Sequence, residues 1–468
     1  MILQSFLTFA LAVCGGFGLA HLLWADSRAW AVLVKFFLGI GIGLGITSCL
    51  YFLRLLFLAG QAGYLLIQAG FFVLILLALF FRDGLSFNAS FKISALSRWQ
   101  IFLSVAWLLV LSFTAYYLIL SSRNSPHGDY DAQAIWNLRA RFIYRLGNDW
   151  ENAFLPNINR NFHMDYPLLV PLNVVGGWNT LHGEVLRIPA VQSMLFLMGL
   201  AGLTYSALAY MRTSSQASMG MIVLLATPLV LLFSTFQTAD IPLSYFFLAS
   251  VILFLLARQQ DSNGLLFLCG LMAGLSAWTK NEGLPFALVI AASVLVTYFH
   301  GRGHKGIISF FAGMALPLLS TLLFKILVPA SNDLLVDNGI LHILQNISDP
   351  GRYGSILLHL KSELAQLGGW PVSILLLLTC YGILMGANIS TRNVHEVCFL
   401  LIVVAAQFFT YMLVYLITPN DVEWQLEYSL SRLLIHLFPM ALLLFFLFVR
   451  TPESIFDPRS PSHNKDHS

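Results

Sequence analysis

The main shortage in this 468-residue chain is charge, because only 10% of its residues are Asp, Glu, Lys or Arg. A soluble domain carries about 25%. Here 58% of the residues are hydrophobic, and the mean hydropathy is +0.78. Such a chain cannot surround one core with a polar surface, and a lipid bilayer is the solvent that suits it. The composition therefore predicts an all-α, polytopic membrane protein in contact with membrane lipids.

Cysteines and basic clusters are scarce as well. The net charge is only +3 and no basic run occurs, so nucleic acid is not an expected partner. The number of cysteines is odd and no Cys-x-x-Cys occurs, which argues against a disulfide framework or a thiolate metal site. All five lie in or beside apolar segments: Cys14, Cys49, Cys269, Cys380 and Cys398. The first apolar run, 2–24, has no basic residues before it, so we expect a retained span rather than a cleavable signal.

Long apolar runs, in contrast, fill most of the chain. A helical span needs about 20 apolar residues, and the sequence predicts about thirteen spans. The second is the least defined, because apolar character continues past Arg54. The spans are 3–24, 30–50, 61–81, 100–120, 187–210, 219–236, 241–257, 264–279, 284–300, 307–329, 369–388, 397–418 and 430–449.

Basic residues in the short loops predict which side is cytoplasmic. The outer side then receives the large loop 121–187, the segments 331–368 and 418–429, and two tight turns at 237–240 and 280–283. An odd number of spans puts the N-terminus outside. The expected regions are N-terminal spans 1–99, a catalytic core 100–329, C-terminal spans 330–450 and a disordered cytoplasmic tail 451–468.

The loop 121–187 holds much of the charge. Apolar residues recur at helical spacing, at Ile135, Leu138, Phe142 and Leu146, which predicts a helix lying along the membrane surface. Its first turn holds Asp129 and Asp131. Helix capping is one interpretation of these acids. A neighbouring His127 and a downstream row of arginines favour a functional role, and the two interpretations do not exclude each other.

A second polar motif is His163-Met164-Asp165-Tyr166-Pro167. Pro167 restricts the preceding backbone to extended conformations, so His163 and Asp165 are expected at the end of a loop. They form either a solvated turn or a contact to substrate or a divalent ion. Two residues are too few to define a metal site, so metal dependence stays open, with Asp131 as a further candidate ligand.

The remaining polar motifs come from segments far apart in the chain. Asp240 precedes Pro242 and is either an N-cap or a functional acid at the membrane boundary. Lys280 either pairs with Glu282 or binds a phosphate. Arg432 opens the last span and either extends toward the interface or holds an anion.

Together these features resemble the GT-C superfamily of integral-membrane glycosyltransferases, most nearly the branch with protein O-mannosyltransferases and lipid A aminoarabinose transferases. Asp131 and residues 132–141 look like the first acidic motif, and Asp240 looks like the second. Lys280 and Arg432 look like the residues that hold the carrier phosphate. The resemblance covers about residues 100–300 and the last span. The Asp-Glu pair usual in the family is absent here, so Asp129 competes with Asp131 for the first acidic position.

The resemblance implies an inverting glycosyltransferase that moves a sugar from a polyprenyl-phosphate carrier to a glycan, lipid or protein. The active site is expected on the outer face of a bacterial inner membrane. Asp131 is the preferred general base, assisted by Asp240. Further substrate-binding candidates are Arg139, Arg141, His163, Asp165, Tyr166 and Glu282. No cofactor is expected beyond the open divalent ion.

Two other functions remain as alternatives. A transporter or flippase of a lipid-linked sugar would need polar residues along a path through the bilayer. The chief ionisable groups in the expected spans are Lys35 and Lys325, which do not form one. The other alternative is an envelope polysaccharide ligase or polymerase, which would share the acids and bases on the outer face.

Overall fold

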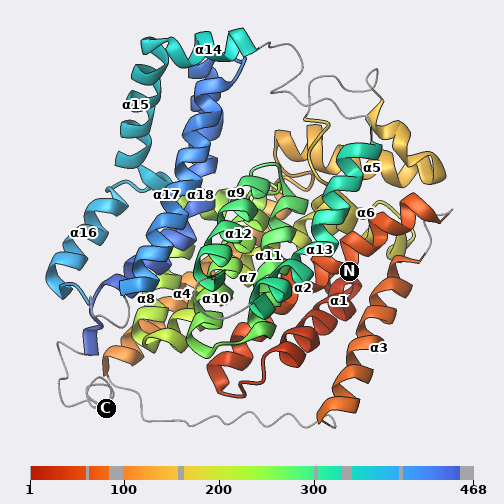
Figure 1. Ribbon diagram of the computed structural model, residues 1–468, viewed down its shortest axis with the longest axis horizontal. Helices are drawn as coiled ribbons and strands as arrows, with labels where there is room; N and C mark the ends of the chain where they lie inside the picture. Colours follow the sequence, from red (N-terminus) through yellow and green to blue (C-terminus); the bar gives the residue numbers. More distant parts are fainter. Residues whose placement is uncertain are drawn as a thin grey trace. The chain divides into compact units, whose positions relative to one another are not determined.

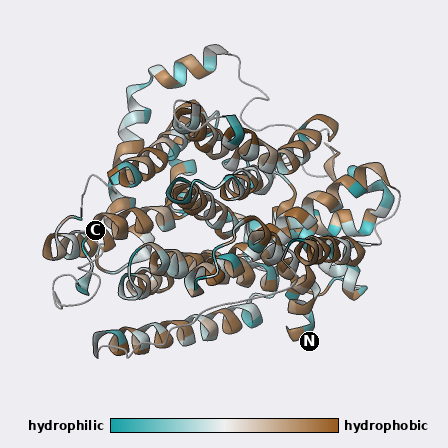
Figure 2. Cartoon of the chain, turned by 60° about the horizontal axis from the view of Figure 1, so that its bottom comes forward, coloured by the Kyte–Doolittle hydropathy of each residue, from teal (hydrophilic) through white to brown (hydrophobic). Residues whose placement is uncertain are grey.

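The apolar runs fold as helices in a computed structural model, which describes residues 2–58, 63–83, 98–155, 163–299, 304–328, 340–388 and 394–453. Within these ranges the chain has no strand, and Ala387 and Val449 form an isolated antiparallel bridge. Nine of the described helices are long and apolar enough to cross a membrane, or up to eleven if two bent pairs each count as one span. The all-α prediction is confirmed, and the helices are those of an integral membrane protein. Apolar residues run along most of them (Figure 2).

The chain divides into two units, which are described one at a time. The first comprises 1–91, 116–203 and 232–336, and the second comprises 92–115, 204–231 and 337–468. The regions expected from the sequence are continuous, whereas these units are assembled from separated segments.

The first unit contains most of the N-terminal and central helices (Figure 1). Helices α4, α7 and α9 begin in one unit and end in the other. The elements are α1 (Ile2–Leu23), α2 (Ala29–Phe57), α3 (Tyr64–Asp83), α4 (Arg98–Asn124), η1 (Ala132–Trp136), α5 (Asn137–Leu146), η2 (Gly147–Phe154), α6 (Leu169–Leu181), α7 (Arg187–Met211), α9 (Pro228–Thr235), α10 (Asp240–Gln260), α11 (Asn263–Thr279), α12 (Gly283–Phe299) and α13 (His304–Leu327).

Close helix packing builds the core of this unit. Helix α11 contacts both α10 and α13, and α1 contacts both α2 and α3. The glycine row of α2 permits close approach: a Cβ on Gly43 would lie 2.0 Å from the carbonyl oxygen of Ala12 in α1. On Gly41 it would lie 2.1 Å from the Tyr245 ring of α10. Small residues thus let α2 pack directly against its neighbours.

Several of the expected spans differ from the helices observed. Helix α2 continues to Phe57, in keeping with the apolar character beyond Arg54. The expected span 219–236 is broken into α8 (Ser214–Ala226) and α9, which are bent by 62° at Thr227-Pro228, because proline cannot continue a helix. Helices α11 and α12 have only 17 residues each. Thirteen spans therefore remain a prediction.

The large loop contains an irregularity that the helical pattern did not reveal. Residues Ala132–Trp136 form a π-helical turn, which adds about one residue to the turn and shifts the register of the helix after it. The apolar stripe Leu138, Phe142 and Leu146 is half-buried. Residues Asn137, Arg139, Ala140 and Ile143 pack against the rest of the chain and are buried. The position of the stripe at the membrane surface stays a prediction.

The same loop also contains α6, an apolar helix that the sequence did not separate from it. Ten of its thirteen residues are buried, and it contacts α1, α2, α3 and α11. The loop is therefore not confined to a surface. Its second half enters the helical core and holds the segment 163–168 just before it.

The second unit is built around two long helices that contact each other, α17 (Val394–Ile417) and α18 (Val422–Phe448). Arg352 donates to the carbonyls of Leu416, Thr418 and Asn420 and so caps the end of α17. The unit's other elements are α8, α14 (Ile340–Ser348), α15 (Pro350–Ala365), η3 (Leu367–Gly369) and α16 (Ile374–Met385). The expected tail falls almost wholly outside the described residues, as does the start of the segment 331–368.

Candidate functional site

Asp240 is the most deeply buried acid of the candidate site. It opens α10 and is 0% exposed. Its carboxylate accepts a hydrogen bond from Thr238 Oγ1 at 2.7 Å and forms an ion pair with Lys280 Nζ at 3.1 Å. The N-cap position belongs to Ala239, which makes no side-chain cap. Asp240 therefore does not act as the N-cap, and its carboxylate is directed to Lys280.

Lys280 lies between two acids. Helix α11 ends at Thr279, and an extended backbone at Lys280 begins the turn to α12. The ammonium lies 3.1 Å from Asp240 Oδ1 and 2.9 Å from Glu282 Oε1, with the side chain only 6% exposed. The expected pairing of Lys280 with Glu282 is thus observed. Because two carboxylates neutralise this buried ammonium, it has little charge left to offer a phosphate. We name Asp240, Lys280 and Glu282 the acid–lysine cluster.

The turn that carries Lys280 is held tightly. The amide of Gly283 donates to the Lys280 carbonyl at 2.9 Å, and Ser276 Oγ donates to the Gly283 carbonyl at 3.0 Å. A Cβ on Gly283 would lie 1.9 Å from the Ser276 carbonyl oxygen. Only glycine allows the start of α12 to approach the end of α11 this closely.

A second charged group adjoins this turn. Asp165 is buried, and its Oδ2 accepts from Asn281 Nδ2 at 2.8 Å and from Lys325 Nζ at 3.1 Å. Lys325 also donates to Asn281 Oδ1 at 2.8 Å and to the Asp165 carbonyl. We name Asp165, Asn281 and Lys325 the Asp165 clamp. Neither Asn281 nor Lys325 was among the site residues predicted from the sequence. A lysine in the last turn of a span that runs outward could have indicated Lys325.

Aromatic rings connect the clamp to the acid–lysine cluster. The Tyr166 ring stacks on Trp136 at 5.5 Å and on His163 at 4.7 Å between centroids. Lys280 Nζ lies 5.7 Å from the centre of the Tyr166 ring, within the range of a cation–π contact. Tyr166 therefore contacts the cluster through Lys280, while His163 and Trp136 stack on Tyr166.

Arg139 of α5 holds the same loop through its backbone. Its guanidinium donates to the carbonyls of Tyr166 and His163 at 3.0 and 2.9 Å. Burial lowers the pKa of Arg139 to about 10, and the nearby Asp165 carboxylate opposes that shift. The group stays charged at neutral pH. It binds backbone, however, so its contacts are those of a positioning residue.

The segment with Asp129 and Asp131 packs on the turn that leads into Asp240. The Asp129 amide donates to the Phe236 carbonyl at 3.3 Å. Asn137 Nδ2 donates to Gln237 Oε1 at 2.8 Å. Both Asp side chains are half-buried, and Asp131 makes no cap to the helix that follows it. The expected nearness of the two acidic motifs is thus observed, with Asn137 and Gln237 as polar links that the sequence did not indicate.

Arg141 of α5 is intermediate in exposure between the buried Arg139 and the exposed Arg145, with 22% of its side chain accessible. Its guanidinium lies 3.1 Å from His127 Nδ1 and 3.6 Å from a Glu184 oxygen. Since an arginine can only donate, His127 Nδ1 accepts and the proton of the neutral ring is on Nε2. A hydrogen bond from Arg145 lowers the pKa of the Glu184 carboxyl.

The last two predictions concern Arg432 and a metal ion. Arg432 belongs to the second unit, where it is half-buried on α18, and its role in the site stays a prediction. Among the residues described, no group of three or more His, Cys, Asp and Glu side chains is arranged to hold a metal. One of the three candidate ligands is otherwise engaged, since the Asp165 carboxylate binds Lys325.

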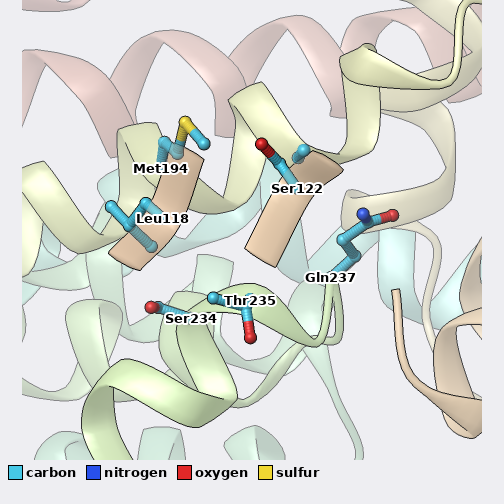
Figure 3. A pocket seen from close by; sticks show the side chains of 7 residues that line it. Leu118, Ser122, Met194, Ser234, Thr235 and Gln237 are labelled. Carbon is cyan, nitrogen blue, oxygen red and sulfur yellow. The ribbon is translucent and has the colours of Figure 1, made fainter. Parts of the chain in front are cut away.

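A small open cleft lies beside Gln237, between the parts of α4, α7 and α9 that belong to the first unit. The space inside it has room for about one water molecule. Leu118 and Met194 line one end and Gln237 lines the other, with Ser122 and Thr235 between them (Figure 3). Ala190 and Ser234 complete the wall. The cleft is thus apolar at one end and polar at the end that adjoins the acidic segment.

No protein-family model, curated protein or solved structure matches the chain.

Proposed function

We propose that this protein is a membrane glycosyltransferase that takes a sugar from a polyprenyl-phosphate carrier and transfers it to an acceptor at the membrane surface. One observation carries the proposal. Five segments far apart in sequence bring acids, cations and stacked rings together where α10 begins and where α11 and α13 end. Intramembrane and boundary charges are costly and mark functional sites by default.

The reaction needs a base beside the acceptor. The acceptor oxygen attacks the anomeric carbon, the bond from that carbon to the phosphate oxygen breaks, and the carrier phosphate leaves with the electron pair. We assign the acceptor's proton to the carboxylate of Asp131, with Asp129 as the competing residue. Both are half-buried on a segment anchored to the turn before Asp240. Such a base contributes about 10²–10⁴ in rate.

The leaving phosphate needs a cation that is not already held tightly by other groups. Lys280 is buried between two carboxylates and Arg139 is bonded to backbone carbonyls. Arg141 is more accessible than either, its carboxylate neighbour Glu184 is 3.6 Å away and bonds more closely to Arg145, and it lies on the helix that follows Asp131. We therefore assign the phosphate contact to Arg141 and give Asp240 and Lys280 a supporting role.

The test compares Asp131→Asn with Asp129→Asn and with Asp149→Asn, which changes an exposed acid in the same loop. Each variant is produced in cells that lack the native protein, and mass spectrometry follows lipid-linked and envelope glycans. The product that depends on the wild-type protein should fall about 10²–10⁴-fold in the D131N variant and persist in the D149N variant.

Wild-type product levels in both the D131N and the D129N variants would remove the proposed mechanism. An assay of purified protein in proteoliposomes distinguishes the proposed transferase from a transporter. Net movement of a labelled lipid-linked sugar without covalent transfer would identify a transporter instead.

A further inference from the structure

We propose that Lys325 is a positioning residue that fixes the two halves of the site against each other. This inference deepens the proposed glycosyl transfer and rests on it. Lys325 lies in the last turn of α13, and it contacts the loop before α6 through Asp165 and the α11–α12 turn through Asn281. One side chain thus bonds to two segments that are more than a hundred residues apart in the chain.

The ammonium of Lys325 is fully used by these contacts. A lysine has three N–H donors and no acceptor. Its three acceptors here are Asp165 Oδ2 at 3.1 Å, Asn281 Oδ1 at 2.8 Å and the Asp165 carbonyl. Although 31% of the side chain is exposed, a substrate anion could gain a donor only by breaking one of these bonds. The geometry therefore favours positioning over direct phosphate binding.

Both ends of the clamp lead directly to groups of the candidate site. Asp165 precedes Tyr166, whose ring stacks on Trp136 and faces the Lys280 ammonium. Asn281 lies between Lys280 and Glu282, which both belong to the acid–lysine cluster. Releasing Lys325 would thus loosen the ring and the turn at the same time.

The end of α13 is a rigid platform for this lysine. Phe324, the residue before it, is 0% exposed. Its ring packs in edge contacts with Trp278, Phe154 and Phe52 at 5.5–6.3 Å between centroids. A cation in the last turn of a helix is also favoured by the helix dipole. Helix α13 therefore fixes the position of Lys325, and Lys325 in turn binds the loop before α6 and the α11–α12 turn.

The experiment measures hydrogen exchange in the full chain in lipid nanodiscs, together with sugar transfer. Lys325→Met keeps the length of the side chain and removes the donors. We expect the Tyr166 and Gly283 amides, which are hydrogen-bonded in the native site, to exchange at least about tenfold faster. Exchange in α17 and α18 should not change. Transfer should fall about 10²-fold in kcat with KM for the donor little altered, since misplacement by about 1 Å costs that much.

Two variants serve as controls. Lys325→Arg keeps a charged donor and should restore slow exchange and most of the transfer. Lys305→Met makes the same change at an exposed position at the opposite end of α13 and should behave as wild type. Unchanged exchange in the K325M variant, equal impairment in the K325R variant, or faster exchange throughout the chain would each overturn the positioning role.

The outcome separates this inference from the proposed reaction. If no glycan product depends on the protein while Lys325→Met still loosens Tyr166 and Gly283, the proposed function fails and the mechanical role of the clamp stands. If Asp131→Asn abolishes transfer while Lys325→Met changes neither exchange nor kcat, the function stands and the positioning role fails.

Discussion

Replacing Lys280 by methionine should be among the most damaging single changes in the chain. The substitution removes an ammonium that is 6% exposed from between Asp240, which is 0% exposed, and Glu282, which is 20% exposed. Two carboxylates would then remain side by side without their shared cation. Neither can regain full hydration without opening the turn between α11 and α12.

The contact distances give the size of the effect. Two unit charges 3.1 Å apart attract by about 5 kcal/mol at an effective dielectric constant of about 20. Removing one partner of a buried pair costs about 3–5 kcal/mol in practice, because the other partner stays buried and uncompensated. We therefore expect Lys280→Met to lower the free energy of unfolding by about 3–5 kcal/mol. Lys325→Met also leaves a buried carboxylate, that of Asp165, but Lys325 is 31% exposed and Asp165 keeps its hydrogen bond from Asn281, so we expect a smaller loss, of about 1–3 kcal/mol.

Equilibrium unfolding in mixed detergent micelles, followed by tryptophan fluorescence and circular dichroism, measures this difference. The double variant Lys280→Met with Asp240→Asn removes the pair together with its uncompensated acid. Its loss should be smaller than the sum of the two single losses by about 1–3 kcal/mol. A loss below about 1 kcal/mol for the K280M variant, or strict additivity in the double variant, would refute the assignment of a strong buried ion pair.

Two further predictions concern the turn and the outer loop. Gly283→Ala should destabilise the protein by about 1–3 kcal/mol, since its Cβ would meet the Ser276 backbone at 1.9 Å; Gly354→Ala, which has open space, should be neutral or stabilising in the same unfolding assay. Because the hydrogen bond from Arg145 depresses the pKa of Glu184, that pair stabilises above the carboxyl's ordinary pKa and is lost as the pH falls through the lowered value. Glu184→Gln should therefore speed hydrogen exchange around residue 184 at neutral pH, and the difference from wild type should disappear as the pH falls below the lowered pKa of the carboxyl; a pH-independent difference would contradict this.

The helices were predictable because burial in lipid selects long apolar runs, which are visible in the sequence. The start of α10 could also be predicted from neighbouring residues, since Pro242 suits the first turn of a helix. The pairing of Lys280 with Glu282 also follows from nearness in the chain. These features depend on residues a few positions apart, and one sequence contains that information.

The rest of the site depends on contacts that composition and spacing do not encode. Asp240 pairs with Lys280, which is forty residues later in the chain, and Asp165 pairs with Lys325, which is 160 residues later. The π-helical turn at Ala132–Trp136 was not predictable either, because the sequence pattern was interpreted with a constant 3.6-residue period. The spacing also did not indicate that Arg139 is buried against the loop that carries Tyr166.

The charges of the site also bear on where a phosphate can bind. Asp165, Asp240 and Glu282 are matched by Arg139, Lys280 and Lys325, so these six groups carry no net charge. Each is engaged with a partner in the site or with backbone carbonyls. A neutral, internally satisfied cluster gains little from an added anion and is better suited to hold geometry. The charge that a carrier phosphate needs must then come from outside the six, and Arg141, after Asp131 on the same helical segment, is the residue of the first unit best placed to supply it.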